Sequence, residues 1–189
     1  MARALTEDQL LDRVAGLFAR HGFDHTSVKD LADAVGLSKA GLLHHYPSKQ
    51  ALFDAARDVG RTHSRELIAQ AERAPAGPAR DRRAVELLVD FALDRPGLIA
   101  LESRAISLLG ADDVDGDLDA LSQHVFTVFD VEQGTGDTAR LVRVIGMLSA
   151  LAVLSLAANH AGDKTAWRPH IIATCLDALG HRDPSHPEA

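Results

Sequence analysis

The sequence predicts an all-α protein with a helix-turn-helix near its N-terminus, and three observations support this. Apolar residues recur with a helical period along nearly the whole chain. Val and Ile alternate with polar residues over no long stretch, which argues against a sheet. Signals for the start and end of helices recur along the chain, and two short helices are separated by a tight turn.

The first helix is expected from about Glu7 to His21. Thr6 and Gln9 can form a capping box at its start, and Gly22 supplies a stop signal at its end. Leu10, Val14, Leu17 and Phe18 would then share one apolar stripe.

The next two helices are short. Ser27 followed by Asp30 marks the start of the second, and Gly36 tolerates the positive φ of the turn that ends it. Leu37 can close the turn from inside, and Ser38 can cap a third helix from Lys39 to about His45. A helix, a short turn with an apolar residue, and a second helix form the helix-turn-helix arrangement.

The remaining chain is predicted to form longer helices, with breaks at proline, glycine and aspartate-rich segments. Their expected ranges are about 48–73, 79–94, 97–109, 118–130, 138–160 and 165–179. The aspartates between 112 and 119 do not fit a calcium loop, because Leu118 and His124 stand where Gly and Glu are needed.

Charge and cysteine content limit the possible functions. The net charge is −7, yet residues 1–53 hold six basic and six acidic side chains, so only this part could offer DNA a surface that is not acidic. The single cysteine, Cys175, excludes an intramolecular disulfide and a cysteine zinc cluster, and we expect a buried thiol there. No signal peptide is visible. We therefore expect a cytoplasmic protein without cofactor or metal.

A resemblance to a known family is carried by HGFDHTSVKDLADAVGLSKAGLLHHYPSKQALFDA, residues 21–55. This stretch resembles the DNA-binding domain of TetR-like (TetR/AcrR family) bacterial transcriptional regulators, and the resemblance covers about residues 6–54. It implies a DNA-binding domain over 1–50, with the helix-turn-helix at about 27–46. It also implies a helical effector-binding and dimerisation domain over 51–189.

The resemblance also implies which residues contact DNA. The third helix would enter the major groove, which requires small or polar exposed residues, while hydroxyls at a helix start suit a phosphate. The residues expected to hold phosphates are Thr26, Ser27, His45, Tyr46 and Lys49. Those expected to read bases are Lys39, Ala40, Gly41 and His44. His44 and His45 are not expected to bind metal, because adjacent helical positions point about 100° apart.

Two positions depart from the family pattern: Gly41 stands where many relatives have Thr, and Leu43 where many have Tyr. Leu43 cannot donate a hydrogen bond to DNA. An alternative is therefore a helical small-molecule sensor, or partner-binding protein, with weakened DNA binding. A second alternative is a small helical enzyme that acts on an apolar substrate, but no catalytic arrangement is visible in the sequence, and no enzyme is expected.

The C-terminal helices suggest a homodimer. Residues 144–158, VIGMLSALAVLSLAA, carry no charge but are shorter than the roughly 20 residues of a membrane span. An all-round apolar helix with small residues suits a four-helix interface with a second copy, as the resemblance implies. The residues expected there are Gly146, Ser149, Ala150, Val153 and Ala157. The alternative is a core helix within one monomer.

A ligand pocket between the middle helices is implied by the resemblance, within residues 79–160. Its candidate residues are Phe91, Glu102, Arg104 and Phe126, although a surface ion pair is the favoured interpretation of Glu102 and Arg104. An apolar effector fits the mostly aliphatic lining. The resulting hypothesis is a dimeric repressor that binds a pseudo-palindromic operator in double-stranded DNA and is released by a small, apolar effector.

Overall fold

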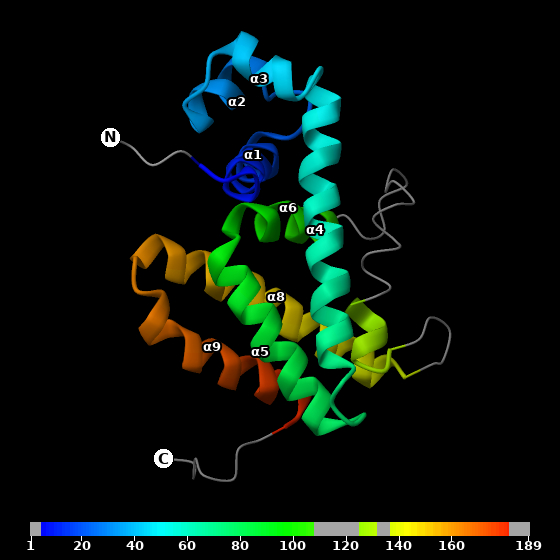
Figure 1. Cartoon of the computed structure of the whole chain (residues 1–189). Helices are drawn as coiled ribbons and strands as arrows, with labels where there is room; N and C mark the ends of the chain where they lie inside the picture. The colour runs from blue at the N-terminus through cyan, green and yellow to red at the C-terminus, as the bar shows by residue number, and fades with distance from the viewer. Residues whose placement is uncertain (1–4, 108–124, 132–136, 182–189) are drawn as a thin grey trace. The chain divides into compact units, whose positions relative to one another are not determined.

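The structure is a computed structural model that describes residues 5–107, 125–131 and 137–181, with the side chains of 104–107 left out. Within these ranges the secondary structure is helical, as predicted (Figure 1). The helices are α1 (Glu7–His21), α2 (Val28–Val35), α3 (Lys39–His45), α4 (Lys49–Ala71), α5 (Pro78–Asp94), α6 (Pro96–Ser107), α8 (Thr138–Ala161) and α9 (Lys164–Leu179). Residues 125–128 form a further helical turn. The predicted aspartate-rich loop lies outside the described residues.

The local signals at the first helices work as predicted. Thr6 and Gln9 form the complete capping box of α1, and Gly22 ends the helix at φ 81°. Ser27 and Asp30 form the capping box of α2. Gly36 follows α2 in the left-handed region at φ 72°, which a residue without a Cβ adopts readily.

The chain forms two compact units. The first comprises Met1–His63 and Arg95–Gly110, so it contains α1 to α3, most of α4, and α6. The second comprises Ser64–Asp94 and Ala111–Ala189, with the end of α4, α5, α8 and α9. The predicted domain boundary at residue 50 stays a prediction.

The first unit is held together by an apolar core and by a close crossing of two helices. Phe18 lies 5.0 Å from Phe53 and 5.8 Å from Phe23 between ring centroids. At the crossing of α1 and α6, a Cβ on Gly97 would lie 1.8 Å from the carbonyl oxygen of Asp12. The core residues with at most 2% exposure include Leu11, Val14, Ala15, Phe18, Leu31, Ala32, Leu42, Leu52 and Ala56.

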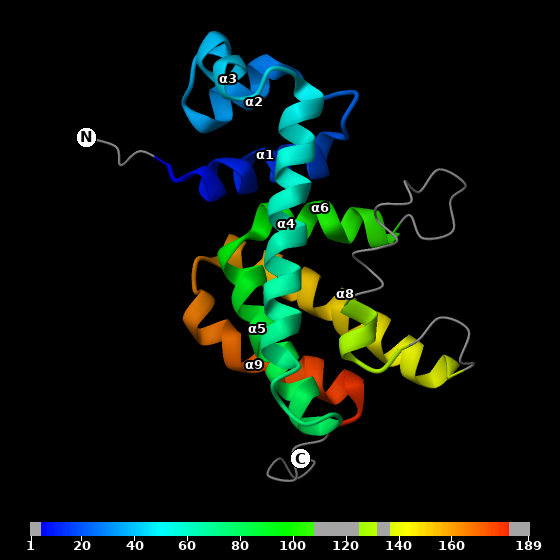
Figure 2. The same ribbon diagram turned by 45° about the vertical axis from the view of Figure 1, so that its right-hand side comes forward.

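In the second unit, α8 packs along α9, and α5 packs against both (Figure 2). Val85, Met147 and Ile171 are among its fully buried side chains, one from each helix. Cys175 is buried as predicted, and burial raises the pKa of its thiol to about 12. Left-handed glycines end two of the helices, with Gly162 after α8 and Gly180 after α9.

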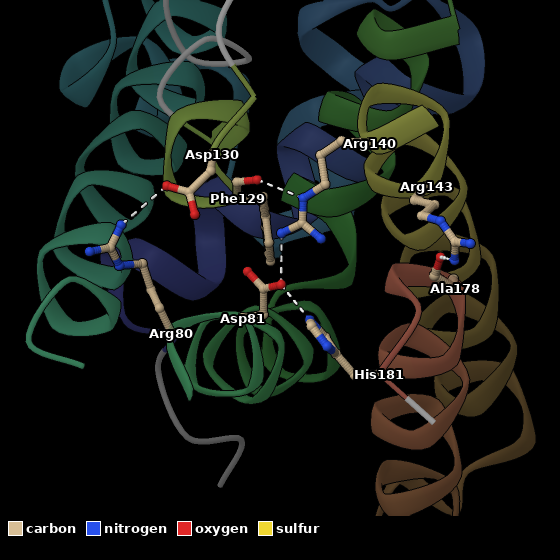
Figure 3. Close-up of polar contacts among 8 residues, drawn as sticks. All are labelled: Arg80, Asp81, Phe129, Asp130, Arg140, Arg143, Ala178 and His181. Carbon is tan, nitrogen blue, oxygen red and sulfur yellow. Dashed lines mark hydrogen bonds and ion pairs between the residues drawn. The ribbon is translucent and has the colours of Figure 1, made fainter. Parts of the chain in front are cut away.

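A buried carboxylate links the elements of the second unit (Figure 3). The side chain of Asp81 on α5 is 2% exposed, and its Oδ2 accepts hydrogen bonds from Arg140 Nη2 at 2.7 Å and His181 Nε2 at 2.5 Å. Arg140 Nε donates to the carbonyl of Phe129 at 2.9 Å. This cluster therefore connects α5, the start of α8, the residue that follows the C-cap of α9, and the segment after the 125–128 turn.

Candidate nucleic-acid interface

The exposed side of α3 carries most of the predicted base-reading residues. Lys39, Ala40 and His44 are exposed, as is the neighbouring His45, whereas Gly41 is half-buried. The helix is anchored from its other side by Leu42, which is 1% exposed. A short helix with a small, polar outer face has the shape and chemistry that the major groove admits.

The turn before α3 sets the position of this helix. After Gly36, the backbone N–H of Leu37 donates to the carbonyl of Ala32 at 3.0 Å, which folds the chain back over the end of α2. Ser38 then caps α3 by accepting a hydrogen bond from the N–H of Gly41 at 3.0 Å. The turn thus presents α3 as the second helix of a helix-turn-helix.

Ser27 is exposed at the start of α2, where a phosphate contact is predicted. Its Oγ accepts from the N–H of Asp30 at 3.1 Å and donates to Asp30 Oδ2 at 2.6 Å. The hydrogen bond from Ser27 Oγ, and a second one from the Ser27 N–H to Asp30 Oδ2 at 3.2 Å, lower the pKa of Asp30. The hydroxyl proton of Ser27, which the predicted phosphate contact would use, is therefore donated to the carboxylate of Asp30.

The side chains of Thr26 and Lys49 both donate to backbone carbonyls of the segment between α1 and α2. Thr26 is only 2% exposed, and its hydroxyl donates to the carbonyl of Gly22 at 2.6 Å. Lys49 Nζ donates to the carbonyl of Phe23 at 2.8 Å and lies 4.2 Å from the centre of the Phe23 ring. Both residues stabilise this segment, and their predicted phosphate contacts stay predictions.

Tyr46 follows α3 and is half-buried. Its Oη donates to Oε1 of Glu7, the first residue of α1, at 3.0 Å. Burial, and then the carboxylate of Glu7, raise the pKa of Tyr46 to about 12. The sequence did not single out Glu7, because an acid in the first turn of a helix ordinarily indicates only a favourable interaction with the helix dipole.

The candidate ligand residues are divided between the two units. Glu102 lies on α6 in the first unit, whereas Phe91 and Phe126 lie half-buried in the second; the side chain of Arg104 lies outside the described residues. A small apolar pocket in the second unit is lined by none of these four residues. Its lining consists of Leu67, Ile68, Ala71, Ala84, Leu88, Val125 and Val128. The assignment of these four residues to a ligand stays a prediction.

Glu102 is instead placed against α4. Its Oε1 lies 3.4 Å from the point where a Cβ on Gly60 would be. Burial raises the pKa of Glu102 from an ordinary 4.5 to about 7, and the opposing effect of Arg57 and Arg61 is smaller. Within the described parts of the chain, no cluster of three or more His, Cys, Asp or Glu side chains could hold a metal ion.

We expect Glu102→Gln to remove a pH-dependent loss of stability. A raised pKa means that the folded chain binds this proton more tightly, so the contribution of Glu102 to the free energy of unfolding is greatest below about pH 4.5 and is lost as the pH rises through 7. At pH 8 the variant should be more stable than the unchanged chain by roughly 2 kcal/mol, with little difference at pH 4.5. Chemical denaturation at both pH values measures this.

The matched control is Glu66→Gln at an exposed position of α4. Its stability should follow that of the unchanged chain over the same pH range. Parallel curves for all three proteins would contradict the burial assigned to Glu102.

Comparison with known proteins identifies the N-terminal segment. Residues 10–56 match the family described as bacterial regulatory proteins, tetR family. The chain is 46% identical over 46 residues to the HTH-type transcriptional repressor KstR2 of Rhodococcus jostii, across 24% of this chain and 22% of that protein. It is 35% identical over 65 residues to the HTH-type transcriptional repressor Rv1474c of Mycobacterium tuberculosis, across 34% and 33% of the two chains. The matches thus span a third or less of these relatives.

Solved structures are similar over nearly the whole chain. A TetR-family transcriptional regulator from Bordetella parapertussis superposes with a TM-score of 0.61 at 22% identity, covering 90% of this chain and 93% of that one. A TetR-like transcriptional regulator from Rhodococcus sp. RHA1 gives a TM-score of 0.56 at 22% identity, covering 96% and 100%. The predicted fold class is therefore confirmed, as is the resemblance that the N-terminal motif indicated.

Proposed function

We propose that this chain belongs to the TetR family of bacterial regulatory proteins, and that it is a dimeric transcriptional repressor that binds a pseudo-palindromic operator in double-stranded DNA. The observation that carries this proposal is the exposed face of α3, formed by Lys39, Ala40 and His44, within the matched residues 10–56. Two such helices, one per protomer, would enter successive major grooves about one helical turn apart. We place the protein in the cytoplasm, where it would meet its operator.

The apolar outer face of α8 supports the dimer. Positions 142, 146, 149, 153 and 157 recur at helical spacing, and Val142 and Val153 are 61% and 66% exposed. By length and composition α8 could also cross a membrane, with a mean hydropathy of 2.2 and a third of its apolar window buried. We assign the face to a second copy, since α8 packs against α9 and the charge-rich α5 in one compact unit. The proposed interface residues are Gly146, Ser149, Ala150, Val153 and Ala157.

We place an apolar effector at the small apolar pocket, which would have to widen to admit it. Its lining comes from the end of α4, from α5 and from the 125–128 turn, all within the second unit. A ligand that occupied and enlarged this pocket would favour whichever arrangement of the dimer leaves room for it. If that arrangement holds DNA less tightly, effector binding lowers the affinity for DNA and repression ends, because the two binding equilibria are linked.

Substitution of the α3 face tests the proposal. We expect Lys39→Ala combined with His44→Ala to weaken operator binding by tenfold or more, since each good base contact contributes about 1–3 kcal/mol of discrimination. Binding to a scrambled fragment should change far less. Titration of labelled fragments with the purified protein measures both affinities.

Arg82→Ala, which removes an exposed positive charge from α5 in the second unit, is the control and should leave both affinities unchanged. Equal affinity of the unchanged protein for operator and scrambled fragments would overturn the proposal. It would favour the alternative of a helical sensor with weakened DNA binding.

A further inference from the structure

Four of the five residues predicted to hold phosphates share a feature. Thr26, Ser27, Tyr46 and Lys49 each donate a hydrogen bond to an acceptor of the first unit itself. For Thr26 and Lys49 the acceptor is a backbone carbonyl. For Ser27 and Tyr46 it is a carboxylate, which has the negative charge and oxygen acceptors of a phosphate.

The contact between Tyr46 and Glu7 is the more informative of the two carboxylate contacts. Asp30 also caps α2, so its bond with Ser27 has a sufficient structural explanation. The cap of α1 is instead made by Thr6 and Gln9, and does not need the side chain of Glu7. Glu7 is exposed and reaches across 39 positions of sequence to the hydroxyl of Tyr46 at 3.0 Å.

We propose that Glu7 competes with a DNA phosphate for the hydroxyl of Tyr46, and so limits the affinity of the first unit for DNA of any sequence. The proposal rests on the proposed function, because it assigns Tyr46 to a phosphate. Glu7 is thereby a determinant of affinity that acts through Tyr46.

Two physical effects act in the same direction. A phenol has one proton to donate, so Tyr46 can donate to Glu7 or to a phosphate but not to both at once. After the exchange, the carboxylate of Glu7 remains close to a second anion, and this repulsion opposes binding at low ionic strength. Glu7→Ala removes both effects, whereas Glu7→Gln removes the charge and keeps one, neutral acceptor oxygen.

The first experiment tests the contact without DNA. Tyr46 is the single tyrosine of the chain, so ultraviolet absorbance of the phenolate reports on this residue alone. With its pKa raised to about 12, Tyr46 should remain largely protonated at pH 11 in the unchanged protein. In the Glu7→Ala variant, Tyr46 should ionise at a lower pH, and circular dichroism should show that the variant is still folded at that pH. Identical titrations would overturn the contact.

The second experiment measures DNA affinity at low salt. We expect Glu7→Gln to bind operator and scrambled fragments several-fold more tightly than the unchanged protein, and Glu7→Ala to bind at least as tightly. In a Tyr46→Phe background, which lacks the hydroxyl, the gain from Glu7→Gln should shrink markedly. Asp8→Asn is the matched control, because it removes the same charge from the adjacent residue, which pairs with His63 and Arg95.

The outcomes separate this proposal from the proposed function. If the unchanged protein binds DNA selectively, but Glu7→Gln gains no more affinity than Asp8→Asn, the role of Glu7 is overturned while the proposed function stands. If Glu7→Gln gains the same DNA affinity with and without the Tyr46 hydroxyl, Glu7 does not compete with a phosphate for that hydroxyl. Absence of selective DNA binding by every protein overturns the proposed function and this role with it, even where the tyrosine titration confirms the contact.

Discussion

Gly97→Ala is expected to lower the free energy of unfolding by about 3 kcal/mol, because the start of α6 lies directly on the backbone of α1. A Cβ at this position would lie 1.8 Å from the carbonyl oxygen of Asp12, which is fixed in the helix. The helices would have to separate, and the hydrogen bond from the N–H of Leu98 to Asp12 Oδ1, 2.9 Å long, would be lost. Chemical denaturation measures the change.

Gly16→Ala is the control at the same crossing. Its Cβ would meet the Cα of Gly97 at 3.4 Å, an ordinary van der Waals contact, and alanine favours the helix. We expect this variant to differ from the unchanged protein by less than about 1 kcal/mol. Equal stabilities of the two variants would contradict the close crossing of α1 and α6.

Arg140→Ala is expected to lower the free energy of unfolding by about 3 kcal/mol, because it leaves a buried carboxylate with one partner fewer. Among the described residues, Asp81 Oδ1 accepts no hydrogen bond, and Oδ2 would retain only that from His181. The variant would also lose the hydrogen bond to the carbonyl of Phe129. The denaturation midpoint of the purified variant tests this.

The comparison for this variant is Arg168→Ala. Arg168 pairs with Asp90 through two hydrogen bonds of 2.5 and 2.9 Å, but both side chains are about half exposed. Pairs in contact with solvent contribute roughly 0–1 kcal/mol, so this loss should be much smaller. Similar losses in both variants would show that burial does not strengthen the Asp81 cluster.

The helix boundaries could be predicted because they depend on residues close in sequence. A hydroxyl three residues before an acid or amide, and a glycine after the last apolar position, determine the ends of α1 and α2 through hydrogen bonds of short range. The exposed face of α3 follows for the same reason, since Leu42 alone must point inward from a seven-residue helix.

The contacts that define the site depend on residues far apart in sequence. Nothing near Gly97 indicates that Asp12 lies beneath it, and Asp81 meets its partners across 59 and 100 positions. The inward direction of Thr26 was missed because a threonine at this position is compatible with either a phosphate or the carbonyl of Gly22. Spacing alone likewise gave no sign that Glu102 lies against α4.

The central claim is that the first unit recognises a specific DNA sequence. The most direct measurement is selection of genomic fragments by the purified protein at about 150 mM salt, where non-specific binding is suppressed. Sequencing of the retained pool should yield a palindromic motif with half-sites about one helical turn apart. A retained pool without an enriched motif would contradict the claim.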